Sequence, residues 1–234
     1  MKVLLKRSLP SSLVLGLHSL AAAFNLLVTE VTIFLGVLKR LVVRPHLPNL
    51  ENGEINLHLG CGGFDHPKFI NIDGFPFPHV HYVQPIGNLE QFKNESVDLI
   101  YACHCLEHFT RREVDRVLAE WFRVLKNGGI LRISVPDFDC LLKIYADPAA
   151  TLADVAPMLL GGQDNKYNHH FAVFNKSSLS NLLLKIGFAE IKVWQPDADE
   201  YTTFDDTSRS SYSLNGVLYP ISLNLEAIVH SNSK

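Results

Sequence analysis

The sequence predicts a doubly wound α/β fold: a mostly parallel, seven-stranded sheet with helices on both faces, preceded by an N-terminal apolar or amphipathic helix. Two observations predict the sheet. From Ile55 onward, short apolar runs of strand length alternate with segments whose apolar residues recur at helical spacing. The first run ends in the glycine-rich turn GCGG, as in a strand that leads into a ligand-binding loop. With 234 residues, 47% of them hydrophobic, the chain can bury a full core.

The N-terminal 44 residues are expected to form a helix in front of this domain. No side chain from Ser8 to Thr29 is charged at neutral pH, and basic residues stand on both sides of this stretch. Apolar side chains recur at steps of three and four from Leu17 to Leu38, while polar residues share another face.

Three alternatives stay open for this segment. A signal peptide would have Ala21–Ala23 before its cleavage site, and a transmembrane helix would have to tolerate His18, Asn25 and Glu30. The alternating spacing favours an amphipathic helix, in which residues 12–38 contact the domain, a second subunit of a homodimer, or a membrane surface.

A polar, turn-rich linker over residues 45–53 leads to the main domain, which is expected to span residues 54–234. A helix should begin after Thr110, because Glu113 stands at the spacing of a capping box, and should end at a glycine pair. The segments 146–175 and 196–220 show no periodicity and are expected to form lids. The other predicted helices are Phe138–Tyr145 and Lys176–Ile186. The predicted strands are Ile55–Leu59, Phe69–Ile72, Val80–Val83, Val97–Cys103, Ile130–Val135, Ala189–Val193 and Leu223–Val229.

Composition excludes several partners. The net charge is −3, and no cluster of basic residues is interleaved with aromatic ones, so nucleic acid is not expected as a partner. The four cysteines lie in apolar or glycine-rich runs and are interpreted as reduced, buried thiols. We therefore expect a cytoplasmic protein, which the N-terminal helix could attach peripherally to the inner membrane face.

The glycine turn and the next strand predict a nucleotide-type site. Gly60, Gly62 and Gly63 allow a ligand to approach the backbone closely, and Asp73 at the end of the second strand could accept hydrogen bonds from two ribose hydroxyls. A dinucleotide fingerprint would need a third glycine after this turn, but Phe64 follows instead. The site therefore suits a ligand without a pyrophosphate.

Five blocks carry a resemblance to a known family: HLGCGG, NID, SVDLIYACHCLEHF, RVLKNGGILRISVPD and GGQDNKYNHHFAVFNKSSLSNLLLKIGF. Over about residues 55–229 the chain resembles a class I S-adenosyl-L-methionine-dependent methyltransferase of Rossmann-like fold. It is most similar to a branch with a short first helix, found among predicted methyltransferases of surface-polysaccharide biosynthesis.

The resemblance implies S-adenosyl-L-methionine as the cofactor, with its methionine part on the glycine turn, its ribose at Asp73 and its adenine near Gln84–Ile86. Two positions depart from the usual pattern, because His58 and Gln84 stand where acidic residues are common. The residues expected to contact the cofactor are His58, Gly60, Cys61, Gly62, Asp73 and Gln84.

Methyl transfer to a hydroxyl needs alignment of donor and acceptor and a base that removes a proton. The candidate catalytic residues near the fourth strand are His104, Glu107 and His108, with Asp137 on the same rim. His170 aligns with a histidine of the resembling branch and is preferred as the base over its neighbour His169. No pair of ligands stands four residues apart on a helix, so no metal site is expected.

The sequence thus predicts O- or N-methylation of a small-molecule or saccharide acceptor. Two other classes remain: a catalytically silent cofactor-binding or scaffold protein that dimerises through its N-terminal helix, and a nucleotide-dependent oxidoreductase.

Overall fold

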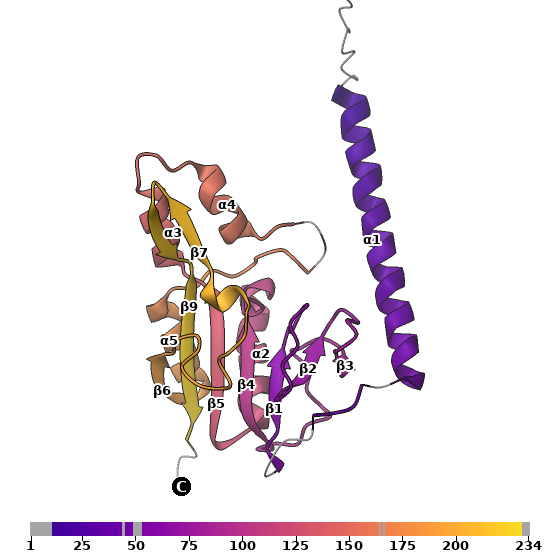
Figure 1. The fold of residues 1–234 in the computed structure, drawn as a ribbon, viewed down its shortest axis with the longest axis vertical. Coiled ribbons are helices and arrows are strands. Elements are labelled where there is room, and N and C mark those ends of the chain that lie inside the picture. Colours follow the sequence, from indigo (N-terminus) through magenta and orange to yellow (C-terminus); the bar gives the residue numbers. More distant parts are fainter. Residues whose placement is uncertain (1–10, 44, 49–52, 164, 166, 231–234) are drawn as a thin grey trace, which may run out of the picture.

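A seven-stranded sheet forms the centre of the molecule (Figure 1). The computed structural model describes residues 11–43, 45–48, 53–163, 165 and 167–230. The strand order is β3-β2-β1-β4-β5-β9-β6, and β9 runs antiparallel to both of its neighbours whereas the other pairs are parallel. The predicted α/β class and mostly parallel sheet are therefore confirmed. The strands are β1 (Asn56–Leu59), β2 (Ile70–Asp73), β3 (Tyr82–Val83), β4 (Val97–Cys103), β5 (Leu125–Pro136), β6 (Phe188–Val193) and β9 (Ser222–Val229).

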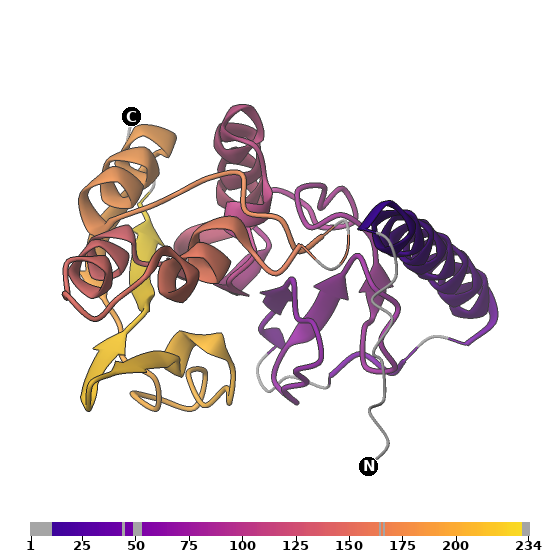
Figure 2. The ribbon, with the colours of Figure 1, turned by 90° about the horizontal axis from the view of Figure 1, so that it is seen from above.

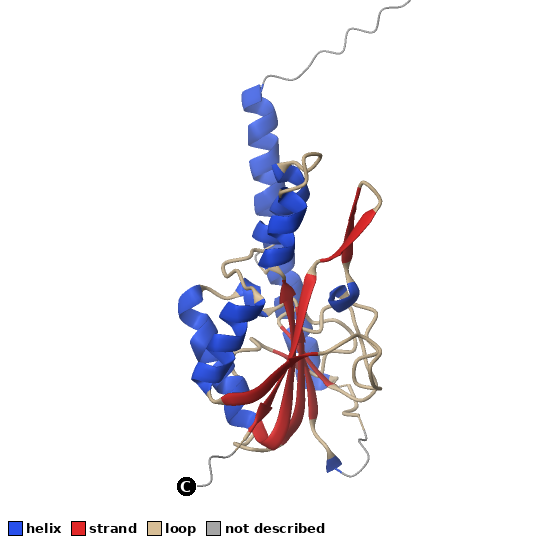
Figure 3. Ribbon diagram, turned by 90° about the vertical axis from the view of Figure 1, so that its left-hand side faces the viewer, coloured by secondary structure: helices blue, strands red, loops and turns tan. Residues whose placement is uncertain are grey.

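One face of the sheet is covered by the helices α2 (Arg111–Val124) and α5 (Lys176–Ile186) (Figure 3). The capping box predicted at the start of α2 is present. The Thr110 side chain accepts from the backbone amide of Glu113, and the Glu113 carboxylate accepts from the backbone amide of Thr110. Trp121, fully buried on the inner face of α2, also donates from its indole nitrogen to the Ile86 carbonyl oxygen at 2.9 Å. This bond fixes the chain that follows β3 against the helix layer.

The opposite face carries an aromatic cluster where helices were also expected. Phe69, Tyr101, Trp194 and Phe204 are buried there, and the rings of Tyr101 and Phe204 stack with centroids 4.0 Å apart. No helix lies between β1 and β2 in the described chain, because only ten residues join them. The chain after β6 covers this part of the sheet instead.

The end of α2 differs from the prediction. The helix was expected to run on to the glycine pair, but it ends at Val124, and Leu125 already pairs with Val97 as the first residue of β5. The register then shifts, so that Leu99 pairs with Ile130 and the residues between form an irregularity in the strand. The predicted strand Ile130–Val135 is therefore the regular part of a longer one.

Both segments expected as lids contain regular structure. The first follows α3 (Phe138–Tyr145) and holds α4 (Leu152–Leu160), whose start is fixed by a capping box of Thr151 and Asp154. The second holds the short helix η3 (Thr207–Arg209) and a hairpin of β7 (Ser211–Leu214) and β8 (Val217–Pro220).

Helix α1 (Ser11–Val42) stands at the β3 edge of the sheet, at the far end of the molecule from α5 (Figure 2). Its last turns are attached to the domain: the Arg40 guanidinium donates to the carbonyl oxygens of Val80 at 3.1 Å and Phe77 at 2.6 Å, and Gly36 lies against Pro76. Among the described helices, α1 included, none has the length and apolar character needed to cross a membrane. The basic residues predicted to precede it lie outside the described residues, as does part of the predicted 45–53 linker.

Candidate active site

A cavity of about 610 Å³ lies beyond the carboxyl ends of β1, β4 and β5. Parallel strands bring their carboxyl ends to one edge of the sheet, which is where ligands bind in doubly wound folds. The cavity is lined from below by the glycine turn and from above by the two lid segments. Its lining residues are His58, Gly60, Cys61, Gly62, Phe64, Cys103, His104, His108, Pro136, Pro157, Met158, Gly161, Gly162, Asn168, His170, Asp206, Thr207, Ser210 and Ile221.

The glycine turn is built so that only glycine fits its first position. Gly60 has a φ of 66°, and a methyl group there would lie 2.8 Å from Cβ of Cys105. Gly62 also has a positive φ, of 53°, yet within the described chain no atom lies within 4 Å of a methyl group placed on it. The turn therefore leaves open space in front of Gly62, which a ligand could fill.

Asp73 ends β2 beside this turn. One carboxylate oxygen accepts from the Gly62 amide at 2.8 Å and the other from the Phe75 amide at 2.7 Å. Burial raises the pKa of Asp73 above its ordinary value, although these amides oppose the shift. The carboxylate fixes the turn and caps the strand, and each oxygen keeps a second lone pair for a further donor.

His58 lies under the turn among aromatic rings. Its side chain is fully buried, with ring centroids 4.7 Å from Phe204 and 5.3 Å from Tyr101. Burial lowers its pKa to about 3, so the ring is neutral at physiological pH. Cys61 is buried too, and burial raises the pKa of its thiol, which keeps it protonated. All four cysteines are buried and free of disulfides, as the sequence predicted.

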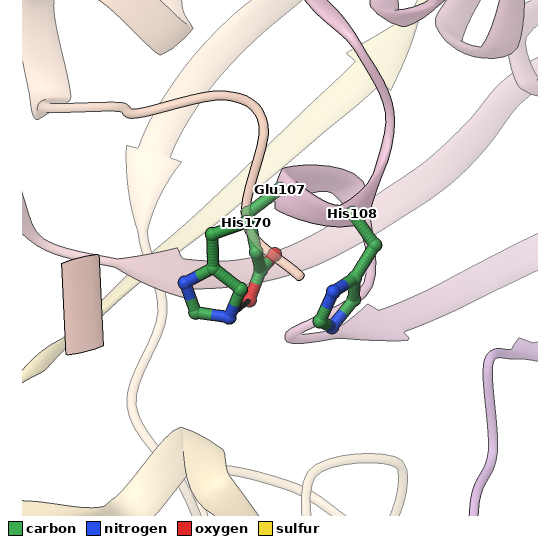
Figure 4. A group of neighbouring side chains, drawn as sticks. All are labelled: Glu107, His108 and His170. Atoms are coloured by element: carbon green, nitrogen blue, oxygen red, sulfur yellow. Dashed lines mark ion pairs between the residues drawn. The ribbon is translucent and has the colours of Figure 1, made fainter. Parts of the chain in front are cut away.

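The four predicted catalytic residues lie together on the far side of the cavity, and Figure 4 shows three of them, Glu107, His108 and His170. His104 follows β4, Glu107 and His108 form the short helix η2 (Leu106–His108), and His170 arrives from the lid. The backbone brings them together, because the carbonyl oxygen of Glu107 accepts from the amide of Phe171 at 2.8 Å.

Glu107 is the centre of this cluster. Its side chain is 1% exposed, and neither carboxylate oxygen accepts a hydrogen bond from any described residue. The nearest ring nitrogens are Nδ1 of His104 at 3.4 Å and Nε2 of His170 at 3.9 Å from Oε1. Burial works against ionisation, but the neighbouring His104 and His108 outweigh it and hold the pKa of Glu107 below its ordinary value. The carboxylate is therefore buried and charged.

Hydrogen bonds on the outer side of each ring fix the orientation of the histidines and indicate which ring nitrogen carries the proton. His170 Nδ1 lies 2.9 Å from the Met158 carbonyl oxygen and His108 Nδ1 lies 3.0 Å from that of His169, so in the neutral rings these nitrogens carry the protons and Nε2 carries the lone pair. The Ser222 hydroxyl donates to the Thr207 carbonyl oxygen, so it accepts from His104 Nε2 at 2.8 Å. Burial lowers the pKa of His170, which favours its neutral form.

Asp73 and Glu107 are not among the lining residues, and three other predicted residues also lie outside the lining of the cavity. Gln84 donates to the Asn88 carbonyl oxygen at 2.6 Å, and Asp137 caps α3 by accepting from the Asp139 amide at 3.1 Å. The ring of His169 stacks on Phe171 outside the cavity lining.

Sequence reasoning predicted the two lid segments but missed most of the residues with which they close the cavity. The Asp206 carboxylate accepts from the Tyr101 hydroxyl at 2.8 Å, and Asp206 lines the cavity beside Thr207 and Ser210. Met158 lines the roof from α4. No motif at Met158 or Asp206 points to the cavity, since the place of these residues depends on packing between distant parts of the chain.

Part of the chain is similar in sequence to known methyltransferases. The family model described as "Methyltransferase domain" matches residues 71–133. The ubiquinone/menaquinone biosynthesis C-methyltransferase of Vibrio vulnificus is 40% identical over 70 residues, which cover 29% of this chain and 26% of that protein. Its counterpart in Vibrio campbellii is 28% identical over 123 residues, or 50% of this chain and 47% of that one. The chain thus matches about a quarter to a half of the length of these relatives.

Solved methyltransferase structures align with most of this chain at low sequence identity. A methyltransferase of Thermotoga maritima, described as a possible histamine N-methyltransferase, superposes with a TM-score of 0.47 at 15% identity, covering 85% of this chain and 88% of that one. A phosphoethanolamine N-methyltransferase of Haemonchus contortus, in complex with S-adenosylhomocysteine, gives a TM-score of 0.48 at 14% identity, covering 84% and 52%.

Proposed function

We propose that this chain, whose residues 71–133 match a methyltransferase domain, is a class I S-adenosyl-L-methionine-dependent methyltransferase that acts on a small-molecule or saccharide acceptor. The observation that carries the proposal is the single cavity bounded on one side by the glycine turn and on the other by the histidine cluster. A donor site and an acceptor site must adjoin, because methyl transfer is a direct displacement that depends on alignment.

The turn fits the cofactor. When bound, S-adenosyl-L-methionine supplies an activated methyl group on a sulfonium. The open space in front of Gly62 suits close approach of its methionine part to the backbone, and Cys61 lines the same wall. We assign Asp73 to the ribose hydroxyls, since its oxygens retain lone pairs. Gln84 lies near the expected adenine, although its amide is already hydrogen-bonded to the Asn88 carbonyl oxygen.

The histidine cluster is proposed as the acceptor side. A neutral His170 carries its proton on Nδ1, which leaves the lone pair of Nε2 to accept a proton from an acceptor hydroxyl or amine. Glu107 beside it would stabilise the imidazolium that forms. His104 and His108 hold the same wall and orient the acceptor.

The chemical class of the acceptor is a more specific proposal. The resemblance to polysaccharide-biosynthesis enzymes favours a saccharide hydroxyl, whereas the curated relatives are named as C-methyltransferases. The apolar face of α1, where Phe24, Leu27, Val31, Phe34 and Leu38 are exposed, supports attachment of the protein to a membrane surface or to a second subunit. Sedimentation of the full chain with lipid vesicles would separate these two, because only membrane attachment moves protein into the vesicle fraction.

Calorimetric titration of the full chain with S-adenosyl-L-methionine and, separately, with NAD tests the proposal. We expect S-adenosyl-L-methionine alone to bind. Asp73→Asn should weaken that binding by roughly 10- to 100-fold, the value of a hydrogen bond to a charged group. Asp65→Asn is the matched control, because this exposed carboxylate lies near the same turn. Binding of NAD without S-adenosyl-L-methionine would overturn the proposal in favour of an oxidoreductase, and cofactor binding without S-adenosylhomocysteine formation across an acceptor panel would favour a scaffold.

A further inference from the structure

Glu107, His108 and His170 have the arrangement of a metal site. One carboxylate oxygen and one ring nitrogen from each histidine lie within 4.8 Å of one another, and none of the three residues is exposed (Figure 4). Tetrahedral ligands at about 2.1 Å from an ion would be roughly 3.4 Å apart, so the side chains need to close by about 1 Å around an ion.

The outer hydrogen bonds of His108 and His170 leave the Nε2 lone pairs of the neutral rings free to bind a ligand. His170 Nδ1 gives its proton to the Met158 carbonyl oxygen, and the lone pair of Nε2 then lies 3.9 Å from a Glu107 oxygen. His104 donates its Nε2 proton to Ser222, and its Nδ1 lies 3.4 Å from the same oxygen. The neutral His170 ring thus turns a lone pair toward a buried carboxylate that accepts no hydrogen bond from the described residues.

The buried Glu107 carboxylate needs a positive charge beside it. A buried carboxylate without a hydrogen-bond donor or a cation is strongly unfavourable, because burial removes its hydration. Ligating histidines in metal sites donate their other ring nitrogen to a backbone carbonyl oxygen or a carboxylate, which fixes the ring and its tautomer. His108 and His170 both do so here, toward the carbonyl oxygens of His169 and Met158.

We propose that Glu107, His108 and His170 bind a divalent transition-metal ion of the class that prefers imidazole and carboxylate ligands, such as Zn²⁺. Three protein ligands leave a coordination position open. His108 and His170 line the cavity, so this position is available to an acceptor oxygen or a water. The role of the ion rests on the proposed function: it would polarise the acceptor hydroxyl and favour its deprotonation, in place of His170 as base.

The site is tested on the full chain after treatment with a chelator and desalting. Titration with Zn²⁺ should show one strong site per chain, Co²⁺ should give visible d–d absorption of low-symmetry nitrogen and oxygen coordination, and Mg²⁺ should not compete. Glu107→Gln and His170→Ala should each weaken Zn²⁺ binding by roughly 100-fold or more. His169→Ala is the matched control, since its ring stacks outside the cavity lining and its backbone carbonyl oxygen is retained.

Thermal unfolding adds a readout that does not require activity. Zn²⁺ should raise the melting temperature of the wild type but not of Glu107→Gln. Glutamine has nearly the same shape as glutamate, so Glu107→Gln should still fold. A loss of Zn²⁺ binding in this variant therefore shows that the loss in His170→Ala is not due to misfolding alone.

Zn²⁺ binding that is absent, or that survives both substitutions unchanged, would overturn the inference and leave only adventitious binding by the other histidines. Titration of S-adenosyl-L-methionine in the presence and absence of Zn²⁺ separates this failure from failure of the proposed function. Cofactor binding without Zn²⁺ binding sinks the metal site alone. Zn²⁺ binding without cofactor binding supports the site and sinks the methyltransferase.

Discussion

Gly60, Gly62 and Gly63 offer a graded test of the cofactor turn, because a methyl group meets something different at each. At Gly60 the added carbon would take up a left-handed conformation and lie 2.8 Å from Cβ of Cys105. At Gly62 the conformation is also left-handed, but the carbon points into space free of described atoms. At Gly63 φ is not positive, and again no described atom lies within 4 Å.

The magnitudes follow from these two contributions. A left-handed conformation costs a residue with a Cβ about 1–2 kcal/mol, and overlap in a packed interior costs about 1–3 kcal/mol. Gly60→Ala should therefore lower the free energy of unfolding by about 2–5 kcal/mol and Gly62→Ala by about 1–2 kcal/mol. Gly63→Ala should leave it unchanged or raise it by about 0.4–1 kcal/mol, because alanine restricts the unfolded chain.

Urea unfolding followed by fluorescence measures the three stabilities, and calorimetry measures affinity for S-adenosyl-L-methionine. Gly62→Ala should lose more in affinity than in stability, since its methyl group would occupy space that we assign to the cofactor. Equal stability losses at Gly60 and Gly63 would refute the reasoning about the turn. An unchanged affinity in Gly62→Ala would refute the assignment of that space.

Three other predictions concern separate parts of the molecule. The buried Arg132 guanidinium pairs with Glu226 at 2.8 Å and with Asp199, so Arg132→Met should cost about 3 kcal/mol in urea unfolding. Burial opposes ionisation of Glu226, but the hydrogen bond from Arg132 outweighs burial and keeps the pKa of Glu226 below its ordinary value. The ionised Glu226 therefore contributes fully to stability at neutral pH, and this contribution is lost as the pH falls through the lowered pKa. The stability of Arg132→Met should depend less on acid pH. Because burial raises the pKa of Asp73, affinity for S-adenosyl-L-methionine should fall on acidification through that raised pKa, and calorimetry should find Asp73→Asn insensitive to pH in the same range. Arg40→Ala removes the donors to the Val80 and Phe77 carbonyl oxygens, so hydrogen exchange in the last turns of α1 should accelerate while urea stability of the domain stays the same.

The sequence predicted the sheet well because its signals are local. The runs that became β1, β4 and β9 are rich in apolar residues and mostly buried, and the capping box at Thr110 marks the start of α2. Parallel strands then bring the residues after β1 and β4 to one edge without further information. This is why the glycine turn and the Glu107 cluster could be predicted as neighbours.

The roof of the cavity could not be predicted in this way. Its place depends on contacts across the chain, such as the bond between Tyr101 and Asp206, 105 residues apart. Local signals for its elements were present, since Thr151 and Asp154 form a capping box and Asn215-Gly216 is a typical hairpin turn. These signals identify a helix and a hairpin, but they do not say that either one covers a ligand site.

The attachment of α1 determines how this helix lies against the domain. The contacts of Arg40 and Gly36 hold its C-terminal part, and from there the helix rises past the carboxyl ends of the central strands, toward the end of the sheet where the cavity lies (Figure 1). If the apolar face of this helix attaches the protein to a surface, that surface would lie toward the carboxyl ends of the strands and not toward their amino ends. An acceptor displayed on it would then approach the end of the sheet at which the histidines lie.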